Sequence, residues 1–430
     1  MRLQDVVRGR RSRDLSKVSR LTVVGAAALV AAACGSSTTG SSSSGGATNP
    51  GVPSGVTVSA FTTDIAATMS QLKPLTAYAT KGANTLLIGL ILPDTTSSVR
   101  WVDFDQPYLT AALADAGFNQ NQFRIDNAQG SDATELDIAT ADINLGAKVL
   151  IMCPLDGPTG SAIAQAAAAK SVTLISYDRA TFQGKNYYVS FDNEAVGEAI
   201  GNGFLKCVTA WNVSSPQVYV LNGGEDTDPN AISFATGYNK VVWSQAAKTV
   251  AAGATNSQGM KLVAENFAPG WSNTTGGTIF QQEYSSHPSI NATIEANDGL
   301  GNAVINVLKA AGVPAKKVPV TGQDATAQGM AWVLESYQCG SVYKPVYKEA
   351  QDAVALADIL LSGNTVPAAL LNGKTTDPAN TSITEPASLL TATWVDATNM
   401  ESTVVKDGFD PASAICAIAG QSLCTSAGIK

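Results

Sequence analysis

The chain has 430 residues, of which 45% are hydrophobic and 14% charged, with a formal net charge of −8 and a single histidine, His287. That length is enough for two or three domains with a sizeable core, and one imidazole excludes most metal sites and nearly all His-dependent nucleophilic catalysis. An acidic chain of low charge density also lacks a basic surface for phosphates, so we expect no nucleic-acid partner and no cofactor.

Residues 1–33 are typical of an export signal. Seven basic residues lead into an apolar run over 21–33, which is too short to remain in a bilayer as a spanning helix. The stretch Leu29-Val-Ala-Ala-Ala-Cys34-Gly35-Ser36 resembles the lipobox of bacterial lipoproteins, in which the signal is cut before a cysteine that then carries lipid. The resemblance implies that Cys34 anchors an exported protein to the outer face of the cytoplasmic membrane. An ordinary secretory signal with an incidental cysteine is the alternative.

Residues 34–83 are expected to hold the anchored cysteine and a flexible tether. Residues 35–53 are rich in Ser, Thr and Gly, a composition typical of unstructured linkers. Residues 60–80 have apolar side chains at helical spacing, but Pro74 interrupts them, so the pattern predicts only a short helix. Without residues 1–33, which carry seven basic and two acidic residues, the net charge falls from −8 to −13.

From Asn84 onward, short apolar runs alternate with stretches of helical period, a pattern typical of βαβ units. The runs predict strands at 85–92, 122–126, 148–153, 172–176, 187–191, 217–221, 261–266, 292–296 and 318–322. Helices are expected between them, for example at 133–145, 160–170, 194–209, 231–246, 301–311 and 346–361. These elements divide near Asp192 into two comparable sets. They therefore indicate an α/β protein with two doubly wound parallel sheets.

Polar and aromatic residues follow most of the expected strands. Ligands of such sheets bind beyond the carboxyl ends of the strands, so these residues are the candidate binding residues. They are Arg100, Trp101, Asp178, Arg179, Asp228, Asn230, Trp271, Asn297, Asp324 and Lys344.

This set of side chains suits a neutral, polyhydroxylated ligand. Carboxylates accept hydroxyl protons, guanidinium and ammonium groups donate to hydroxyl oxygens, and amides do both. The two indoles suit the apolar C–H faces of a sugar ring. Each residue alone has a structural explanation: Asp as a helix cap, Arg179 as a partner of Asp178, and Trp as core. Their joint placement at strand ends favours binding.

The same residues lie in motifs whose order and spacing resemble a known family. The motifs are Arg100-Trp101, Ile175-Ser-Tyr-Asp-Arg179, Val189-Ser-Phe-Asp-Asn-Glu-Ala-Val-Gly197, Asp228-Pro-Asn-Ala231, Pro269-Gly-Trp271, Ala296-Asn-Asp298, Thr321-Gly-Gln-Asp-Ala325, Val342-Tyr-Lys-Pro345 and Val404-Val-Lys-Asp-Gly-Phe409. Over residues 86–409 the chain resembles the periplasmic sugar-binding proteins of ABC importers, type I, in the ribose/galactose-binding group. Within that group it is most similar to the D-xylose-binding branch.

The resemblance implies two lobes joined by a three-segment hinge, which closes over one sugar and docks on a permease. Lobe I is expected at 84–192 plus 345–372, and lobe II at 193–344 plus 373–430. The resemblance also implies hydrogen bonds to the sugar from Arg100, Asp178, Arg179, Asn230, Asn297, Asp324 and Lys344, ring packing by Trp101 and Trp271, and Asp228 as a further member. The expected protein is a monomeric binding protein, not an enzyme, and delivers a monosaccharide, D-xylose, to an ABC transporter.

Departures from the family pattern leave the ligand open to another pentose, a hexose or a polyol. Pro229 stands where the branch has a second Asn, the preceding turn 224–228 is acidic, and the segment 375–386 is longer than in the family. A sugar sensor for a membrane receptor is one alternative function. A second is an exported two-carboxylate enzyme using Asp178 and Asp324. Against it, the adjacent Arg179 would keep Asp178 ionised, whereas a general acid must hold a proton.

Five cysteines follow Cys34, so at least one of them is unpaired. Cys416 and Cys424 close a short loop, and an oxidising compartment favours a disulfide between them. Cys207 with Cys339 is a second option that spacing does not support. Cys153 ends an apolar strand and is expected to be a small buried hydrophobe.

Overall fold

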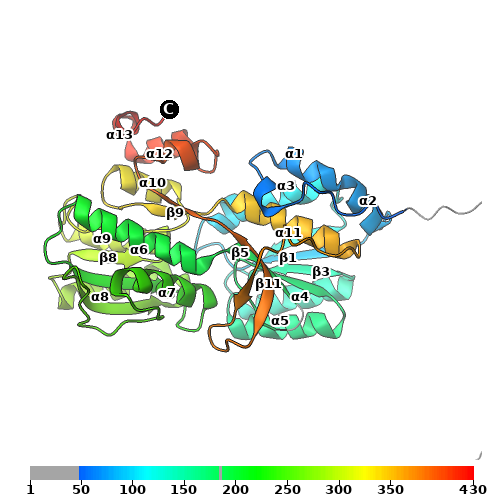
Figure 1. The fold of residues 1–430 in the computed structure, drawn as a ribbon, viewed down its shortest axis with the longest axis horizontal. Helices are drawn as coiled ribbons and strands as arrows, with labels where there is room; N and C mark the ends of the chain where they lie inside the picture. Colours follow the sequence, from blue (N-terminus) through cyan, green and yellow to red (C-terminus); the bar gives the residue numbers. More distant parts are fainter. Residues whose placement is uncertain (1–47, 184–185) are drawn as a thin grey trace, which may run out of the picture. The chain divides into compact units, whose positions relative to one another are not determined.

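The structure, a computed structural model, describes residues 48–183 and 186–430. The expected export signal and the expected lipidated Cys34 lie outside the described residues. The described chain forms two α/β lobes, each with a mostly parallel sheet between helices (Figure 1). This confirms the fold class expected from the alternating pattern.

The sheet of lobe I has seven strands in the order β10-β11-β5-β4-β3-β1-β2. Every neighbouring pair is parallel except β10 with β11, and Ile88 on β1, next to the edge strand, pairs with Phe123 on β2 and Val149 on β3. The strands are β1 (Ile88–Leu92), β2 (Phe123–Asn127), β3 (Val149–Met152), β4 (Thr173–Tyr177), β5 (Tyr187–Phe191), β10 (Gly373–Thr376) and β11 (Thr384–Leu390). All residues of β1 and β3 are buried, because helices cover both faces of the sheet.

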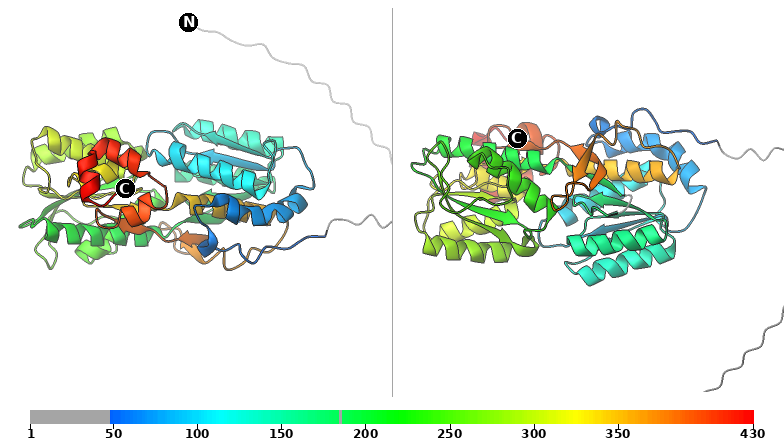
Figure 2. Two further views of the ribbon diagram at one scale, coloured as in Figure 1. Left: turned by 90° about the horizontal axis from the view of Figure 1, so that it is seen from above. Right: turned by 60° about the horizontal axis from the view of Figure 1, so that its bottom comes forward.

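The two faces of this sheet pack against different helices (Figure 1, Figure 2). Ile88, Leu90 and Leu92 point into a core shared with the face made by α1 (Ile65–Met69), α2 (Lys73–Thr80), α3 (Gln106–Ala116) and α11 (Val346–Leu361). Ile91 points the other way, into a core shared with α4 (Asp132–Leu145) and α5 (Gly157–Ala169). The short helical segments η1 (Val58–Ala60), η2 (Ser70–Leu72) and η3 (Trp101–Asp105) complete lobe I.

Lobe II is built around a parallel sheet of order β7-β6-β8 and a small antiparallel pair, β12-β9. Its strands are β6 (Gln217–Gly223), β7 (Lys261–Ala268), β8 (Ala292–Glu295), β9 (Ser341–Tyr343) and β12 (Thr393–Val395). Its helices are α6 (Asn193–Ala210), α7 (Pro229–Trp243), α8 (Asn273–Ser286), α9 (Asp298–Ala310), α10 (Ala327–Leu334), α12 (Ala412–Ala419) and α13 (Gln421–Ser426), with the short segments η4 (Pro269–Trp271) and η5 (Glu401–Val405).

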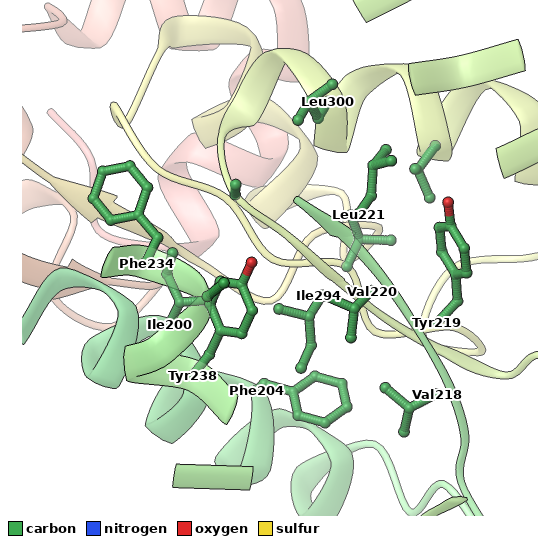
Figure 3. Packing of buried hydrophobic residues seen from close by; sticks show 14 of the residues in the cluster. Ile200, Phe204, Val218, Tyr219, Val220, Leu221, Phe234, Tyr238, Ile294 and Leu300 are labelled. Atoms are coloured by element: carbon green, nitrogen blue, oxygen red, sulfur yellow. The ribbon is translucent and has the colours of Figure 1, made fainter. Parts of the chain in front are cut away.

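The core of lobe II fixes the position of α7. Phe204 on α6 and Tyr238 on α7 pack with Ile294 on β8 in the core cluster shown in Figure 3. Helices α6 and α7 approach so closely that a Cβ added at Gly197 would lie 2.1 Å from the carbonyl oxygen of Phe234. This close approach brings the first turn of α7, with Asn230, toward the junction with lobe I.

The chain crosses between the lobes three times, as expected for this fold. The crossings run from Phe191 to Asn193, from Tyr343 to Val346 and from Leu390 to Thr393. The position of the third crossing shows that the division expected from the sequence, which assigned 373–430 to lobe II, is wrong in part. Residues 373–390 belong to lobe I instead, because β11 pairs in parallel with β5 and carries β10 with it as an antiparallel edge strand.

Residues 60–80 hold helices as expected, α1 and α2, but the segment 56–80 is not part of a free tether. It packs onto lobe I through the buried side chains Val56, Phe61, Met69, Leu72 and Leu75. Pro74 does not interrupt the helix, because it lies in the first turn of α2, where backbone N–H groups have no intrahelical acceptor. Lobe I therefore begins well before residue 84.

The strand expected at 318–322 is absent from the described sheets. Thr321 N donates to the carboxylate of Glu295 at 2.9 Å, and Glu295 N donates to Thr321 Oγ1 at 2.8 Å. The backbone N–H groups of Glu295 and Thr321 therefore bond to side chains and not to the neighbouring strand's carbonyl oxygens. The segment 318–322 still runs beside β8, since Thr293 N donates to the carbonyl oxygen of Pro319.

The structure pairs Cys416 with Cys424 and also Cys207 with Cys339, whereas Cys153 is buried and has no disulfide partner among the cysteines that the structure describes. The Cys207–Cys339 bridge links residues 132 positions apart, which explains why spacing alone gave no support for it. In the part of the chain that the structure describes, every helix is too short or too polar to span a bilayer.

Several buried carboxylates form no ion pair with any basic residue that the structure describes, and their burial affects the stability of the fold. Glu295 is fully buried and bonds to Thr321, while Asp352 on α11 is fully buried and bonds to Ser388. Burial raises the pKa of each carboxyl group to about 8, more than its hydrogen bonds lower it.

We expect the free energy of unfolding to fall as the pH rises from about 5 to about 8. In that range the folded state keeps protons that the unfolded chain, with carboxyl pKa values of ~4, has already released. Each such group therefore lowers the free energy of unfolding by ~1.4 kcal/mol for every pH unit. Denaturant titrations at pH 5, 6.5 and 8 measure the slope. Glu295→Gln should flatten it by about that amount, whereas Asp137→Asn, at an exposed position on α4, should leave it unchanged. Equal slopes in wild type and Glu295→Gln would contradict this expectation.

Candidate ligand-binding site

Residues from both lobes and from one crossing enclose a polar pocket. Its lining residues are Ser97, Ser98, Arg100, Trp101, Asp178, Arg179, Asn230, Phe234, Trp271, Asn297, Gln323, Asp324 and Lys344. Most of them follow the carboxyl ends of β1, β4, β6, β7, β8 and β9, which is where ligands of such sheets bind.

Nine of the ten residues expected from the sequence line this pocket, and Asp228 does not. Asp228 instead caps α7, accepting from the backbone N–H of Asn230 at 2.8 Å, and it accepts from Trp271 Nε1 at 2.8 Å. It therefore positions two lining residues.

Sequence reasoning missed four lining residues: Ser97, Ser98, Phe234 and Gln323. Phe234 lies one helical turn after Asn230 on α7, a spacing that places both on one face and was a usable signal. Gln323 is adjacent to Asp324. The two serines carried no distinguishing signal, since serine is common in any loop.

Arg100 is held by three carboxylates in a buried cluster. Its Nε and Nη2 donate to Asp105 at 2.9 and 2.8 Å, Nη2 also donates to Glu349 at 2.9 Å, and Nη1 donates to Asp178 at 2.7 Å. The side chain is 2% exposed. A guanidinium has five N–H groups, so this arrangement fixes its orientation while leaving one Nη1 hydrogen for a ligand.

Asp178 is an ionised acceptor at any physiological pH. Burial alone would raise its pKa, but the charges of Lys344, Arg100 and Arg179 together lower the pKa of this carboxyl group to about 2. Its backbone has a φ of 63°, and the strained conformation persists because its carbonyl oxygen accepts from Tyr188, Ser190 and Asn230. Arg179 makes no ion pair with Asp178; it donates to the carbonyl oxygen of Pro154 at 3.1 Å.

Lobe II contributes acceptors and a shared cation near the crossing. Asn230 Nδ2 donates to Asp178 Oδ1 of lobe I at 2.9 Å, and Ser98 of lobe I donates to Asp324 Oδ2 at 3.1 Å. Lys344 Nζ lies 3.6 Å from both Asp178 Oδ2 and Asp324 Oδ1. At that distance the ammonium group offsets the charge of both carboxylates but forms no close hydrogen bond with either.

Two buried acceptors in the pocket have no hydrogen-bond partner among the described residues. They are Oδ1 of Asp324 and Oε1 of Gln323. Asn297 uses its Oδ1 to cap α9, which leaves its amide N–H groups for the pocket. Because buried polar atoms are normally satisfied, this arrangement suits a ligand that supplies hydroxyl donors and also accepts.

Two indole rings provide apolar surfaces in the pocket. Trp101 is 3% exposed and its Nε1 donates to Ser97 Oγ at 3.3 Å. Trp271 is 7% exposed and meets the Phe234 ring edge-on, with 6.2 Å between centroids. With their N–H groups satisfied, both rings can pack on the C–H face of a ligand.

Trp271 lies directly on Gly223 at the end of β6, where a Cβ would lie 1.9 Å from ring atom Cζ3. We therefore expect Gly223→Ala to displace the indole and to weaken ligand binding about 2- to 10-fold, since an aromatic contact of this kind contributes ~0.5–1.5 kcal/mol beyond the area it buries. Isothermal calorimetry measures the loss. In a double-mutant cycle with Trp271→Ala, the two losses should be far from additive. Additive losses would show that Gly223 does not act through the ring.

Comparisons with known proteins agree with this architecture. A family model described as periplasmic binding protein domain matches residues 88–365. The chain is 29% identical over 288 residues to the D-xylose-binding periplasmic protein of Escherichia coli, covering 66% of this chain and 80% of that protein. It is 28% identical over 330 residues to the multiple sugar-binding periplasmic protein SbpA of Azospirillum brasilense, covering 75% and 89%.

Solved structures share the fold. A carbohydrate transporter solute-binding protein of Chloroflexus aurantiacus in complex with D-glucose has a TM-score of 0.64 at 26% identity, covering 77% of this chain and 98% of that one. An ABC transporter solute-binding protein of Clostridium phytofermentans with bound β-D-glucose has a TM-score of 0.65 at 23% identity, covering 76% and 99%.

Proposed function

The chain belongs to the periplasmic binding protein domain family, and on that premise we propose that it binds one monosaccharide between its lobes and delivers it to the permease of an ABC transporter. The observation that carries the proposal is the pairing of unsatisfied acceptors with free donors around one pocket. Within residues 48–183 and 186–430, buried oxygens of Asp324 and Gln323 have no hydrogen-bond partner, and Arg100 and Asn297 retain unused N–H groups. A sugar hydroxyl both donates and accepts, so a sugar satisfies both kinds of group.

The charge balance of the pocket favours a neutral ligand. Cations and carboxylates are present in similar number at the pocket, and Asp178 contacts both Arg100 and Lys344. They are Arg100, Arg179 and Lys344 on one side and Asp105, Asp178, Asp324 and Glu349 on the other. A charged ligand would leave one of these buried groups unpaired, at a cost of several kcal/mol.

D-Xylose is the ligand that we propose first, because a D-xylose-binding protein is among the relatives and the motif residues of that branch line the pocket. Another pentose, a hexose or a polyol is the alternative, since other relatives bind several sugars by name or hold D-glucose in their structures. Pro229, which replaces the second Asn of the D-xylose-binding branch, lies next to the pocket residue Asn230. This position favours a sugar specificity that differs from that of the branch.

We propose that the sugar binds more tightly to the arrangement in which the two lobes are together than to the one in which they are apart. Asp178 and Arg100 belong to lobe I, whereas Asn230 and Asp324 belong to lobe II, so a sugar touches all four only when the lobes are together. The backbone at the three crossings absorbs the motion, and the permease recognises the sugar-bound form. No covalent step is involved, and the ionised Asp178 is unsuited to act as a general acid.

The cellular context is part of the proposal. We infer an exported monomer, anchored through lipid on Cys34 to the outer face of the cytoplasmic membrane, where it meets its permease. A membrane sensor in place of the permease is the second candidate partner. Mass spectrometry of the membrane fraction from the native host tests the anchor: an acylated Cys34 at the N-terminus supports it, and an unmodified chain starting elsewhere contradicts it.

A thermal-shift panel on residues 48–430, which form one compact unit, tests the ligand. The panel contains D-xylose, D-ribose, L-arabinose, D-galactose, D-glucose, xylitol and myo-inositol. A sugar at 100 times its Kd should stabilise the folded state by ~2.7 kcal/mol. A shift with D-xylose alone supports the first choice, a shift with another member names the alternative, and no shift with any member contradicts sugar binding.

A further inference from the structure

The loop 322–326, which carries two lining residues of the sugar pocket, has a strained backbone. Asp324 has a φ of 90° and Ala325 a φ of 51°, so two consecutive residues with side chains adopt positive values that glycine adopts far more readily. Such a conformation persists only where the surrounding contacts hold it. Gln323 and Asp324 also carry the two pocket oxygens that have no hydrogen-bond partner among residues 48–183 and 186–430. The groups that hold this loop therefore determine where those oxygens lie.

One buried carboxylate, that of Asp298 at the start of α9, holds the loop. Its Oδ2 accepts from the backbone N–H and the hydroxyl of Thr326, at 2.8 and 3.0 Å. Its Oδ1 accepts from Gln338 Nε2 and from Ser341 Oγ, both at 2.8 Å. Its backbone N–H donates to the carbonyl oxygen of Gln323 at 2.9 Å. Asp298 is fully buried and is not among the lining residues of the sugar pocket.

Ser341 extends the effect of this carboxylate to Ala325. Its Oγ donates to Asp298 Oδ1 and accepts from Ala325 N at 3.0 Å, so its hydrogen points at the carboxylate and its lone pair at the loop. On the same strand, Val342 accepts from Asp324 N at 2.9 Å. Asp298 thus holds the residues on both sides of Asp324, while β9 holds Asp324 itself.

The ionised form of Asp298 suits these contacts and the protonated form does not. A carboxylate has about four lone-pair sites, and the four donors use them, so a carboxyl proton would face a donor and displace one hydrogen bond. Gln338, Ser341 and Thr326, which face the group from neighbouring elements, are uncharged. Burial and the charge of Asp324 raise the pKa of the Asp298 carboxyl group to about 7, more than its hydrogen bonds lower it.

The backbone encloses the carboxylate from two sides. A Cβ added at Gly322 would lie 2.0 Å from Asp298 Oδ1, and one added at Gly329 would lie 2.2 Å from Oδ2. The loop and the first turns of α10 therefore pack directly on the carboxylate oxygens, and a change in their charge or hydrogen bonding acts on the loop first.

We propose that Asp298 is a positioning residue of the sugar site, whose ionised carboxylate sets the loop 322–326 so that Gln323 and Asp324 face the ligand. Sugar binds more tightly to the chain with ionised Asp298 than to the chain with the protonated group. The inference rests on the proposed function and adds to it a residue outside the pocket that controls affinity.

Calorimetry on residues 48–430 at pH 8 and pH 5.5, with the sugar that the panel identifies, tests the inference. Asp298→Asn keeps the size of the side chain and replaces one acceptor with a donor, so at pH 8 we expect binding at least ~10-fold weaker. Wild type should lose about the same factor between pH 8 and pH 5.5, as Asp298 takes up its proton, whereas the affinity of Asp298→Asn should change by less than about twofold.

Asp358→Asn is the matched control. Asp358 on α11 is fully buried, accepts from Thr76 Oγ1 at 2.8 Å, and has a pKa that burial raises to about 7, but it is not among the lining residues of the pocket. This variant should keep the wild-type affinity and its pH dependence. The same loss in Asp358→Asn as in Asp298→Asn would show a general effect of buried carboxylates and would overturn the inference.

Hydrogen exchange of the sugar-free chain gives a readout at the loop itself. The amides of Asp324, Ala325 and Thr326 are all hydrogen-bonded, and in Asp298→Asn they should exchange at least ~10-fold faster than in wild type at the same pH. Ser341→Ala is a second variant in case Asp298→Asn does not fold. It should weaken binding at pH 8 at least ~3-fold and speed exchange at Ala325.

The outcomes separate this inference from the proposed function. If wild type binds sugar and Asp298→Asn binds it equally well at pH 8, the inference fails alone. It fails equally if binding weakens without faster exchange at residues 324–326, because Asp298 then does not act through the loop. If wild type binds no sugar of the panel, the proposed function fails and the inference fails with it.

Discussion

Replacing Arg100 with methionine is expected to abolish sugar binding and to lower the free energy of unfolding by about 3–5 kcal/mol, the usual cost of removing one partner from a buried ion cluster. Asp105 and Glu349 are fully buried, and burial raises the pKa of each carboxyl group while the Arg100 charge lowers it, so without the guanidinium both groups lose the cation that opposes the burial cost. Tyr177 would remain as a donor to Asp105, at 2.6 Å. Binding is lost as well, because Asp178 loses the group that orients it.

A rescue variant separates the stability effect from the binding effect. Arg100→Met combined with Asp105→Asn and Glu349→Gln removes the orphaned charges and should recover most of the lost stability, since apolar or neutral replacements of whole buried ion clusters are often tolerated. Sugar binding should stay absent in the triple variant. Denaturant unfolding and calorimetry measure the two properties. Stability within about 1 kcal/mol of wild type in the single variant would mean that the cluster contributes little.

Replacing Asp324 with asparagine is expected to weaken sugar binding about 100-fold with little loss of stability. Two charge-assisted hydrogen bonds contribute ~1.5–3 kcal/mol each, and the amide supplies only one acceptor oxygen. Asparagine is the suitable replacement because Asp324 has a φ of 90°, a positive value that asparagine tolerates better than alanine does. Alanine at this position would therefore confound binding with backbone strain.

Calorimetry on Asp324→Asn gives the affinity, and thermal unfolding without sugar gives the stability. Asp137→Asn, an exposed carboxylate on α4, is the matched control and should change neither. Wild-type affinity in Asp324→Asn would show that the unpaired Oδ1 of Asp324 does not face the sugar. A large drop in stability would instead assign Asp324 a structural role beside Lys344.

Much of the fold was predictable because its determinants are local. Continuous apolar runs such as 148–153 predict strands buried on both faces, and β3 follows that pattern. The site was predictable for a related reason: the ends of parallel strands converge, so residues after different strands meet. Asp178 and Asp324 lie far apart in the chain, yet Lys344 lies 3.6 Å from both.

What escaped prediction depends on contacts between distant residues. Glu349 bonds to Arg100 across 249 positions, and nothing in the helical pattern of α11 distinguishes that carboxylate from a surface one. The β10–β11 hairpin was placed in the wrong lobe because the parallel pairing of β11 with β5, about 200 positions earlier in the chain, leaves no mark in the local sequence of the hairpin. The segment 318–322 looked like a strand, but side-chain hydrogen bonds of Glu295 and Thr321 replaced the ladder.

The central claim, that one sugar is held by both lobes at once, is tested most directly by calorimetric titration of three proteins with the sugar that the panel identifies. These are residues 48–430 as wild type, the lobe I variant Asp178→Asn and the lobe II variant Asp324→Asn. We predict one sugar per chain for the wild type and an affinity at least ~10-fold lower in each variant. Wild-type affinity in either variant would show that its lobe does not hold the sugar, and would contradict the account.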